Sequence, residues 1–226
     1  MINLFKFIIG SVLGSFISLV NVRTFRHESI LYPRSHCDYC QHQLKTWELI
    51  PIISFILLKG KCAKCHHSID PSFLITEIIS GLIILINPLT ANGCFNDGVE
   101  LILLLLSLCD YKSLAMPVLP IGTLIALALI NLAKTGQNAT ILLITAIYLI
   151  ISVLNYKHQL IGSGDIDIIF SLTLITGWQT VSIIVLIASL LSLGYYYSLK
   201  SVRLIPFVPF LSISYLITTE ILSIKK

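Results

Sequence analysis

The stretch Ile161-Gly162-Ser163-Gly164-Asp165-Ile166-Asp167-Ile168-Ile169-Phe170 places two carboxylates at the start of an apolar segment. That segment looks long enough to enter a membrane, where a charged residue at the bilayer centre costs at least ~2.5 kcal/mol. Charged residues in such a position usually line a site rather than face lipid. Gly162 and Gly164 let the backbone turn sharply or approach a substrate closely. The stretch therefore predicts a membrane helix with a functional site at its mouth.

The composition of the whole chain agrees with a membrane location. The chain has 226 residues, of which 56% are hydrophobic and 12% are charged, and its mean hydropathy is +0.91. Ordinary soluble domains are about 25% charged. The apolar segments are long runs rather than alternating patterns, which favours helices over a barrel. We therefore predict an all-α, polytopic integral membrane protein.

The hydrophobic pattern predicts about eight transmembrane helices. They cover residues 2–22, 71–89, 98–114, 117–133, 139–155, 165–177, 179–199 and 206–224. Residues 23–70 form the one long polar region, and within it 49–58 is too short to span and is predicted to lie in the interface or to re-enter. We expect three parts: a first helix (1–22), a loop (23–70) and a membrane-embedded core (71–226). Gly10 and Gly14 in the first helix belong to a small-residue stripe that predicts close helix packing.

The positive-inside rule orients these helices. With eight spans, one side receives Arg23, Arg26, Arg34, Lys45, Lys59, Lys61, Lys64, Lys112, Lys157, Lys200 and Arg203, and the other receives Lys6, Lys134, Lys225 and Lys226. The first loop is therefore predicted to be cytoplasmic. Asp110 and Asp165 were not used in this count, yet both fall at the cytoplasmic face.

Asp110 ends the apolar run before Tyr111 and Lys112, so it and Asp165 are candidates for one catalytic pair. Two close carboxylates share a proton, so that one activates water while the other protonates a substrate carbonyl. Each also has a simpler interpretation: Asp110 as an interfacial residue solvated by headgroups, and Asp165 as a helix N-cap. Asp167 is a competitor, but its position two residues on points to another helix face.

The polar loop carries two Cys-x-x-Cys pairs, Cys37/Cys40 and Cys62/Cys65. Four thiolates at this spacing predict a tetrahedral zinc site, and a closed four-sulfur shell indicates a structural metal. Iron remains open, because the spacing suits it as well. The metal would fold a loop too short to build its own core. Histidines flank both pairs, but we expect them to be exposed.

Several motifs taken together resemble the type IV prepilin peptidase family. They are Gly14-Ser15-Phe16, the two cysteine pairs, Trp47 to Phe55, Leu58 to Cys62, Glu77, Gly162-Ser163-Gly164-Asp165 and Ile205 to Leu211. The resemblance runs nearly end to end. This chain departs from the family at Met116-Pro117-Val118, where Asp or Asn often follows the Ile-Pro. It departs again at Asp167, where Lys is common.

The resemblance implies that Asp110 and Asp165 are the catalytic pair and that Gly162, Gly164 and Glu77 lie at the substrate site. An equally good interpretation of Glu77 is a residue that lies at the level of the lipid headgroups. The family is a leader peptidase that cuts prepilins or pseudopilins at the cytoplasmic face of the bacterial plasma membrane. It then methylates the new N-terminus with S-adenosylmethionine, for which no motif is visible here.

Two other functions compete with this one. Intramembrane acids also relay protons in transporters, but transport sites usually lie near the midplane and the cysteine loop has no place in that function. A scaffold that binds pilins without cutting them fits the sequence equally well, and only an activity assay separates it. No feature indicates nucleic-acid binding.

Overall fold

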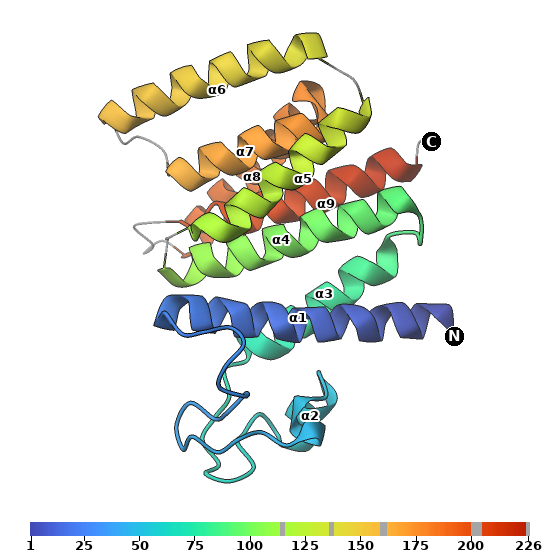
Figure 1. Ribbon diagram of the computed structural model, residues 1–226, viewed down its shortest axis with the longest axis vertical. Coiled ribbons are helices and arrows are strands. Elements are labelled where there is room, and N and C mark those ends of the chain that lie inside the picture. The colour runs from blue at the N-terminus through green and yellow to red at the C-terminus, as the bar shows by residue number, and fades with distance from the viewer. Residues whose placement is uncertain (114–115, 136–137, 159–161, 200–204, 225–226) are drawn as a thin grey trace. The chain divides into compact units, whose positions relative to one another are not determined.

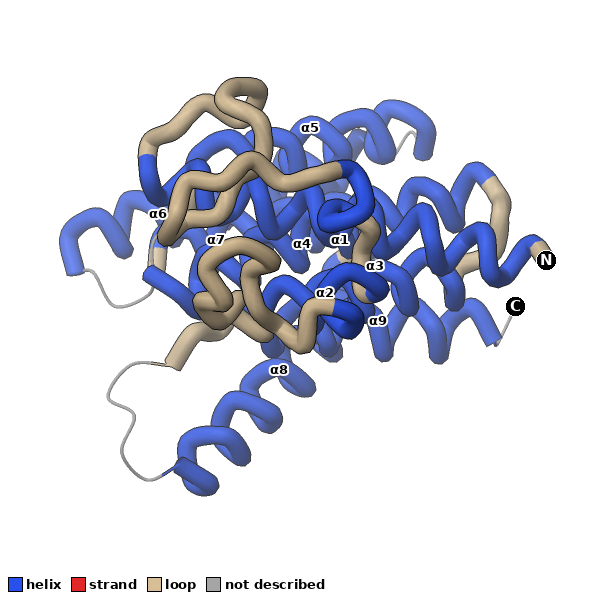
Figure 2. The backbone as a smooth tube through the Cα atoms, turned by 90° about the horizontal axis from the view of Figure 1, so that it is seen from below, coloured by secondary structure: helices blue, strands red, loops and turns tan. Residues whose placement is uncertain are grey.

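The computed structural model describes residues 1–113, 116–135, 138–158, 162–199 and 205–224. All regular elements within these ranges are helices, as Figures 1 and 2 show. The predicted all-α class is therefore confirmed. Leu114, Ile161, Lys200, Arg203, Lys225 and Lys226, which the sequence predictions used, lie outside the described residues.

The elements follow the predicted segments with shifted ends. They are α1 (Ile2–Arg26), the 3-10 helix η1 (Thr46–Leu49), α2 (Ile53–Leu57), α3 (Ser72–Ile86), α4 (Ala91–Ser113), α5 (Val118–Thr135), α6 (Asn138–His158), α7 (Ser163–Thr176), α8 (Trp178–Leu199) and α9 (Val208–Ile224). Within the described ranges, α1, α4 and α8 are long and apolar enough to cross a membrane, and α3, α5, α6 and α9 contain shorter apolar helices. The chain is a membrane protein.

The largest shift is at the start of α4, which begins at Ala91 rather than at residue 98. The prediction began the helix after the charged Asp97, at residue 98, and already included Glu100. The structure accommodates both carboxylates, since Asn87 Nδ2 donates to Asp97 Oδ1 at 2.9 Å and to Glu100 Oε2 at 3.3 Å. Hydrogen bonding therefore allows this helix to carry polar residues in its first turns.

The chain divides into two compact units, Met1–Leu105 and Leu106–Lys226. In the first unit, α1 packs along α3 at short range (Figure 1). A Cβ added at Gly10 would lie 2.7 Å from the Cα of Gly81, and one added at Gly14 would lie 3.0 Å from the Cα of Glu77. The predicted small-residue packing is thus confirmed, because side chains at these positions would hold the helices apart.

In the second unit, α7 contacts α5, α6 and α8, and α8 also contacts α9. Ile168 and Leu172 of α7 are almost completely buried. Asn131 Nδ2 of α5 donates to the carbonyl oxygen of Ile175 at 3.1 Å and fastens α5 to the far end of α7. The packing fixes α7 from several sides, so its first turn, which carries Asp165, has a defined position.

Candidate functional site

The four cysteines of the loop form one cluster in the first unit, with all four sulfur atoms within 4.8 Å of one another. Cys37 Sγ lies 3.8 Å from Cys65 Sγ, and Cys40 Sγ lies 3.9 Å from Cys62 Sγ. Thiolates bound at about 2.3 Å around a tetrahedral zinc lie about 3.8 Å from one another. The sulfur positions therefore fit a four-thiolate metal site, and these four cysteines are free of disulfides.

The two cysteine pairs are held by the same backbone pattern. Cys37 N–H donates to the carbonyl oxygen of His42, and Cys62 N–H donates to that of His67, both at 2.9 Å. The turn of each pair closes through a residue with positive φ, Gln41 at 56° and His66 at 58°. Each loop thus directs two sulfur atoms toward a common point. The sequence spacing predicted that the four sulfur atoms could meet, but not the backbone turns that bring them together.

Backbone donors also favour the thiolate form of Cys62, whereas the pKa of the neighbouring Cys65 thiol is raised to about 12. The N–H groups of Cys65 and Lys64 point at the Cys62 sulfur and lower the pKa of that thiol to about 7. A thiol with such a pKa readily becomes the thiolate that binds metal. The loop histidines are not part of the four-sulfur cluster found among the described residues.

Glu77, expected at a substrate site or at headgroup level, is buried in α3 and holds the loop. Its Oε2 accepts a hydrogen bond from the backbone N–H of Ile52 at 2.7 Å. Ile52 has φ of 63°, a costly conformation for a β-branched residue, and it precedes the five residues of α2. The Glu77 carboxylate therefore stabilises a strained turn. The segment 49–58 folds around this turn and, as predicted, contains no helix able to span.

Asp110, near the end of α4, is buried in the second unit and contacts the start of α9. Its Oδ2 accepts a hydrogen bond from the backbone N–H of Val208 at 3.0 Å. This contact gives the carboxylate a defined orientation at a helix N-terminus, where the macrodipole favours an anion. Asp110 is therefore a fixed internal group rather than one solvated by headgroups.

Asp165 is the third residue of α7, whose N-cap is Gly162. The alternative interpretation of Asp165 as the N-cap is wrong, because no side-chain cap is formed and the helix begins two residues earlier. Its Oδ1 atom is buried and has no hydrogen-bond partner among the residues that the structure describes, and the negative charge of Asp110 acts on its carboxylate. The structure thus brings the two aspartates within electrostatic range and leaves one oxygen of Asp165 to be satisfied.

The two glycines before Asp165 are close to other side chains. A Cβ on Gly162 would lie 2.9 Å from Asp165 Oδ2, and one on Gly164 would lie 2.8 Å from the Cβ of Met116. Gly164 is buried and helical, so its backbone needs no positive φ. Gly162 therefore borders the carboxylate directly, whereas the space beside Gly164 is taken by Met116.

Asp167 is committed elsewhere in the second unit. The hydroxyl of Tyr148 in α6 donates to Asp167 Oδ1 at 2.7 Å, and the Tyr148 ring stacks on Phe170. The expectation that Asp167 points to a different face from Asp165 agrees with this contact.

The segment Ile205 to Leu211 had no role in the function predicted from the sequence. Its Val208 N–H is the donor to Asp110, and Pro206 stands just before the helix. A proline close to a helix start indicates that free backbone N–H groups follow it, and this signal could have identified the segment as a partner for a carboxylate. Which carboxylate those N–H groups meet is decided only by tertiary contacts.

Comparisons with known proteins point in one direction. The family described as "Bacterial Peptidase A24 N-terminal domain" matches residues 8–90, and the one described as "Type IV leader peptidase family" matches residues 99–197. No solved structure matches the chain.

Curated relatives carry the name prepilin leader peptidase/N-methyltransferase. The protein from Stutzerimonas stutzeri is 28% identical over 175 residues, covering 71% of this chain and 60% of the relative. The one from Bacillus subtilis (strain 168) is 43% identical over 74 residues, covering 33% and 30%. That from Dichelobacter nodosus is 28% identical over 202 residues, covering 82% and 70%. This chain thus spans less than two thirds of the first two of these relatives.

Proposed function

The chain belongs to the peptidase A24 family, and on this premise we propose that it is a prepilin leader peptidase and N-methyltransferase. Its substrates are type IV prepilins, as the names of its relatives suggest, or the related pseudopilins. The observations that support the peptidase half are that the Asp165 carboxylate lies within electrostatic range of Asp110 and that its buried Oδ1 has no hydrogen-bond partner among the described residues.

Asp110 and Asp165 act as an aspartic dyad that holds one proton between them. One carboxylate removes a proton from a water molecule, which attacks the scissile carbonyl carbon, while the other donates its proton to the carbonyl oxygen. Collapse of the tetrahedral intermediate breaks the C–N bond and the amine leaves with a proton returned by the dyad. Two observations support this assignment: the Val208 N–H orients Asp110, and Asp165 Oδ1 has no hydrogen-bond partner within the described part of the chain.

The protein crosses the bacterial plasma membrane about eight times, with the dyad at the cytoplasmic face. The surplus of basic residues in the loop after α1 supports this orientation. The eight proposed spans are the three longer candidates α1, α4 and α8, the shorter apolar helices α3, α5, α6 and α9, and the short α7. The prepilin's own apolar helix lies in lipid while its scissile bond reaches water at the dyad.

Zinc occupies the four-cysteine cluster and folds the loop of residues 23–70, separate from the peptidase core of residues 71–226. The sulfur distances support a tetrahedral ion without an open coordination position, so this metal has a structural role. Glu77 helps to keep the loop in place through Ile52, and Gly162 leaves space next to the Asp165 carboxylate.

The methyl donor is S-adenosylmethionine. When bound, it would supply the methyl group that replaces a proton on the new N-terminal amine.

Incubation of the purified full chain with a prepilin tests the proposal, with mass spectrometry reading both products. We expect the prepilin to lose the mass of its leader peptide and the mature pilin to gain the mass of one methyl group. A protein that binds prepilin without cutting it would support the scaffold function instead, and one that only conducts protons in vesicles would support a transporter.

A further inference from the structure

The polar loop of the first unit exposes a group of large apolar side chains. They come from η1, α2 and the turn between them and are between 42% and 68% exposed: Trp47, Leu49, Ile50, Ile53, Ile56 and Leu57. Together they form the η1–α2 surface. Glu48, the one charged residue between Thr46 and Leu58, is buried and accepts a hydrogen bond from the backbone N–H of Lys45. In a polar loop, an exposed apolar surface of this kind marks an interaction site.

The η1–α2 surface lies beside α1 rather than beyond the end of that helix, as Figure 1 shows. Ile52, which connects η1 to α2, donates its N–H to Glu77 Oε2 at 2.7 Å. The Cα of Glu77 lies next to Gly14 of α1, since a Cβ on that glycine would be 3.0 Å from it. Gly14 is twelve positions before Arg26, and this separation corresponds to about 18 Å along a helix. A glutamate side chain is short compared with that distance, so α2 begins well inside the length of α1.

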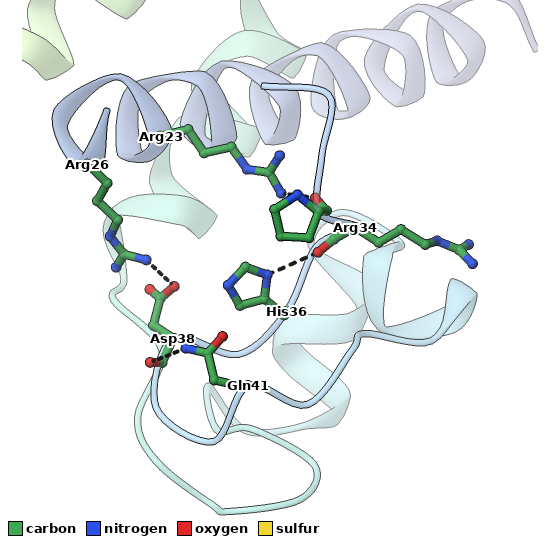
Figure 3. A network of polar contacts seen from close by, with 7 residues as sticks. Arg23, Arg26, Arg34, His36, Asp38 and Gln41 are labelled. Atoms are coloured by element: carbon green, nitrogen blue, oxygen red, sulfur yellow. Dashed lines mark hydrogen bonds and ion pairs between the residues drawn. The ribbon is translucent and has the colours of Figure 1, made fainter. Parts of the chain in front are cut away.

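The end of α1 marks the level of water. Arg26 pairs with Asp38 at 2.6 Å, and the two side chains are 41% and 56% exposed. Arg23, one turn earlier, donates to three backbone carbonyl oxygens and fastens the start of the loop to the helix end (Figure 3). An exposed ion pair is stable at the headgroups but not in hydrocarbon. The η1–α2 surface therefore lies on the membrane side of this level.

The backbone of the segment is suited to lipid, where each polar group must be paired within the protein. The N–H groups of Ser54, Ile56 and Leu58 donate to carbonyl oxygens four residues earlier. Pro51 has no N–H group to satisfy. The N–H of Ile52 has no such helical partner, and the Glu77 carboxylate accepts it instead. Glu77 thus supplies what the turn needs to lie at membrane depth.

Basic side chains flank the η1–α2 surface on both sides. Lys45 precedes η1, Lys59 and Lys61 follow α2, and all three are exposed. Long lysine side chains reach headgroup level from the edge of the hydrocarbon and are attracted to anionic lipids there. On either side of Gly14 in α1, Val12 and Phe16 are exposed as well. The surface therefore continues the exposed apolar face of a helix that is long and apolar enough to cross the membrane.

We propose that the η1–α2 surface is inserted in the lipid leaflet at the end of α1. Ile53, Ile56 and Leu57 lie among the acyl chains, and the three flanking lysines contact anionic headgroups. The inference goes beyond the proposed function and needs only the membrane location of the chain. The segment is then a re-entrant anchor that holds the cysteine loop against the bilayer.

A single-tryptophan reporter tests the insertion. The chain has two tryptophans, Trp47 and Trp178, so Ile56→Trp combined with Trp47→Phe and Trp178→Phe leaves one indole on the surface. The full chain is reconstituted in vesicles of phosphatidylcholine and phosphatidylglycerol. We expect blue-shifted emission, strong quenching by a spin label on the upper part of the acyl chain, and little quenching by acrylamide in the water.

Tyr39→Trp in the same Trp-free background is the matched control. Tyr39 belongs to the same loop, is 71% exposed and follows Asp38, which lies in the exposed ion pair. Its indole should show the reverse pattern, with strong quenching by acrylamide and little by the acyl-chain label. Metal content equal to that of the wild type verifies that both reporters keep the loop folded.

A charge variant tests the lipid headgroups. Lipid quenching of the Ile56→Trp reporter should increase when phosphatidylglycerol is added to phosphatidylcholine vesicles. Joint replacement of Lys45, Lys59 and Lys61 by glutamine should remove this increase, because the side chains no longer attract anions. Quenching that is independent of phosphatidylglycerol in the unsubstituted reporter would overturn the role of the lysines.

The other outcomes contradict insertion in distinct ways. Strong acrylamide quenching of the Ile56→Trp reporter would place the surface in water, and equal lipid quenching of both reporters would contradict the difference in depth. Protection from both quenchers would show that another part of the chain covers the surface. Acrylamide quenching that disappears only when prepilin is added would assign the surface to the apolar helix of the substrate. None of these measurements requires cleavage or methylation, so their failure leaves the proposed function standing.

Discussion

The backbone N–H of Val208 donates a hydrogen bond to Asp110 Oδ2 at 3.0 Å, although the two residues are 98 positions apart. The bond joins the end of α4 to the start of α9. It orients one carboxylate of the proposed dyad through a backbone N–H group. Of the substitutions at position 208, only proline would remove this N–H group.

Asp110→Asn should abolish prepilin cleavage, with a loss of at least about 100-fold, because the amide cannot exchange the dyad's proton. The asparagine oxygen can still accept from Val208, so the melting temperature should stay close to that of the wild type. Asp110→Ala should lose activity and also about 1 kcal/mol of stability. Gel-shift assays of cleavage and thermal scans in detergent measure the two effects.

Asp165→Asn should be equally inactive, because the dyad needs both carboxylates. Asp167→Asn is its matched control two residues further along α7, and it should remain active because its carboxylate bonds to Tyr148 instead. Substantial cleavage by Asp165→Asn, or loss of cleavage in Asp167→Asn, would show that Asp165 is not the second catalytic carboxylate.

Removal of the metal should loosen the loop and leave the aspartates unchanged. Elemental analysis should find one zinc per chain, and Cys37→Ser should lower that amount, because a four-thiolate shell loses one ligand. Limited proteolysis between residues 23 and 70 should become faster in the same preparation. A metal-free chain with a protease-resistant loop would contradict the site, and iron in place of zinc would correct its identity.

Glu77→Gln and Glu77→Ala separate support of the loop from substrate binding. Glutamine keeps an acceptor for Ile52 N–H, whereas alanine leaves a strained turn without it, at a cost of about 1–3 kcal/mol. The alanine variant should show faster proteolysis near residue 52, and the glutamine variant should not. An intact loop in both variants, with a raised KM for prepilin, would indicate that Glu77 contacts the substrate instead.

Gly164→Leu should block cleavage while zinc content and expression stay normal. The leucine would collide with Met116, since even a Cβ at this position approaches the Met116 Cβ to 2.8 Å. Gly164→Ala should be partly active, and adding Met116→Ala should restore it further. If the double variant cleaves no faster than Gly164→Ala, contact with Met116 is not the reason for the lost activity. That result would indicate that Gly164 faces the substrate.

Much of this protein follows from its sequence alone. Long apolar runs determine an all-α membrane protein, because helices satisfy their backbone groups within one segment. Two Cys-x-x-Cys pairs determine that four sulfur atoms can gather around one ion. Hydropathy was less informative at the start of α4, where residues 91–97, which end in the charged Asp97, were left out of the predicted helix.

Tertiary structure alone decided which partner each polar group has. The sequence could present Asp165 as a helix cap and Glu77 as a headgroup residue, since both interpretations depend on neighbours distant along the chain. Only the folded chain places Ile52 against Glu77 and Val208 against Asp110. The physical reason is that periodicity specifies which face of a helix is apolar, whereas hydrogen bonds are short and directional and depend on how the helices are packed.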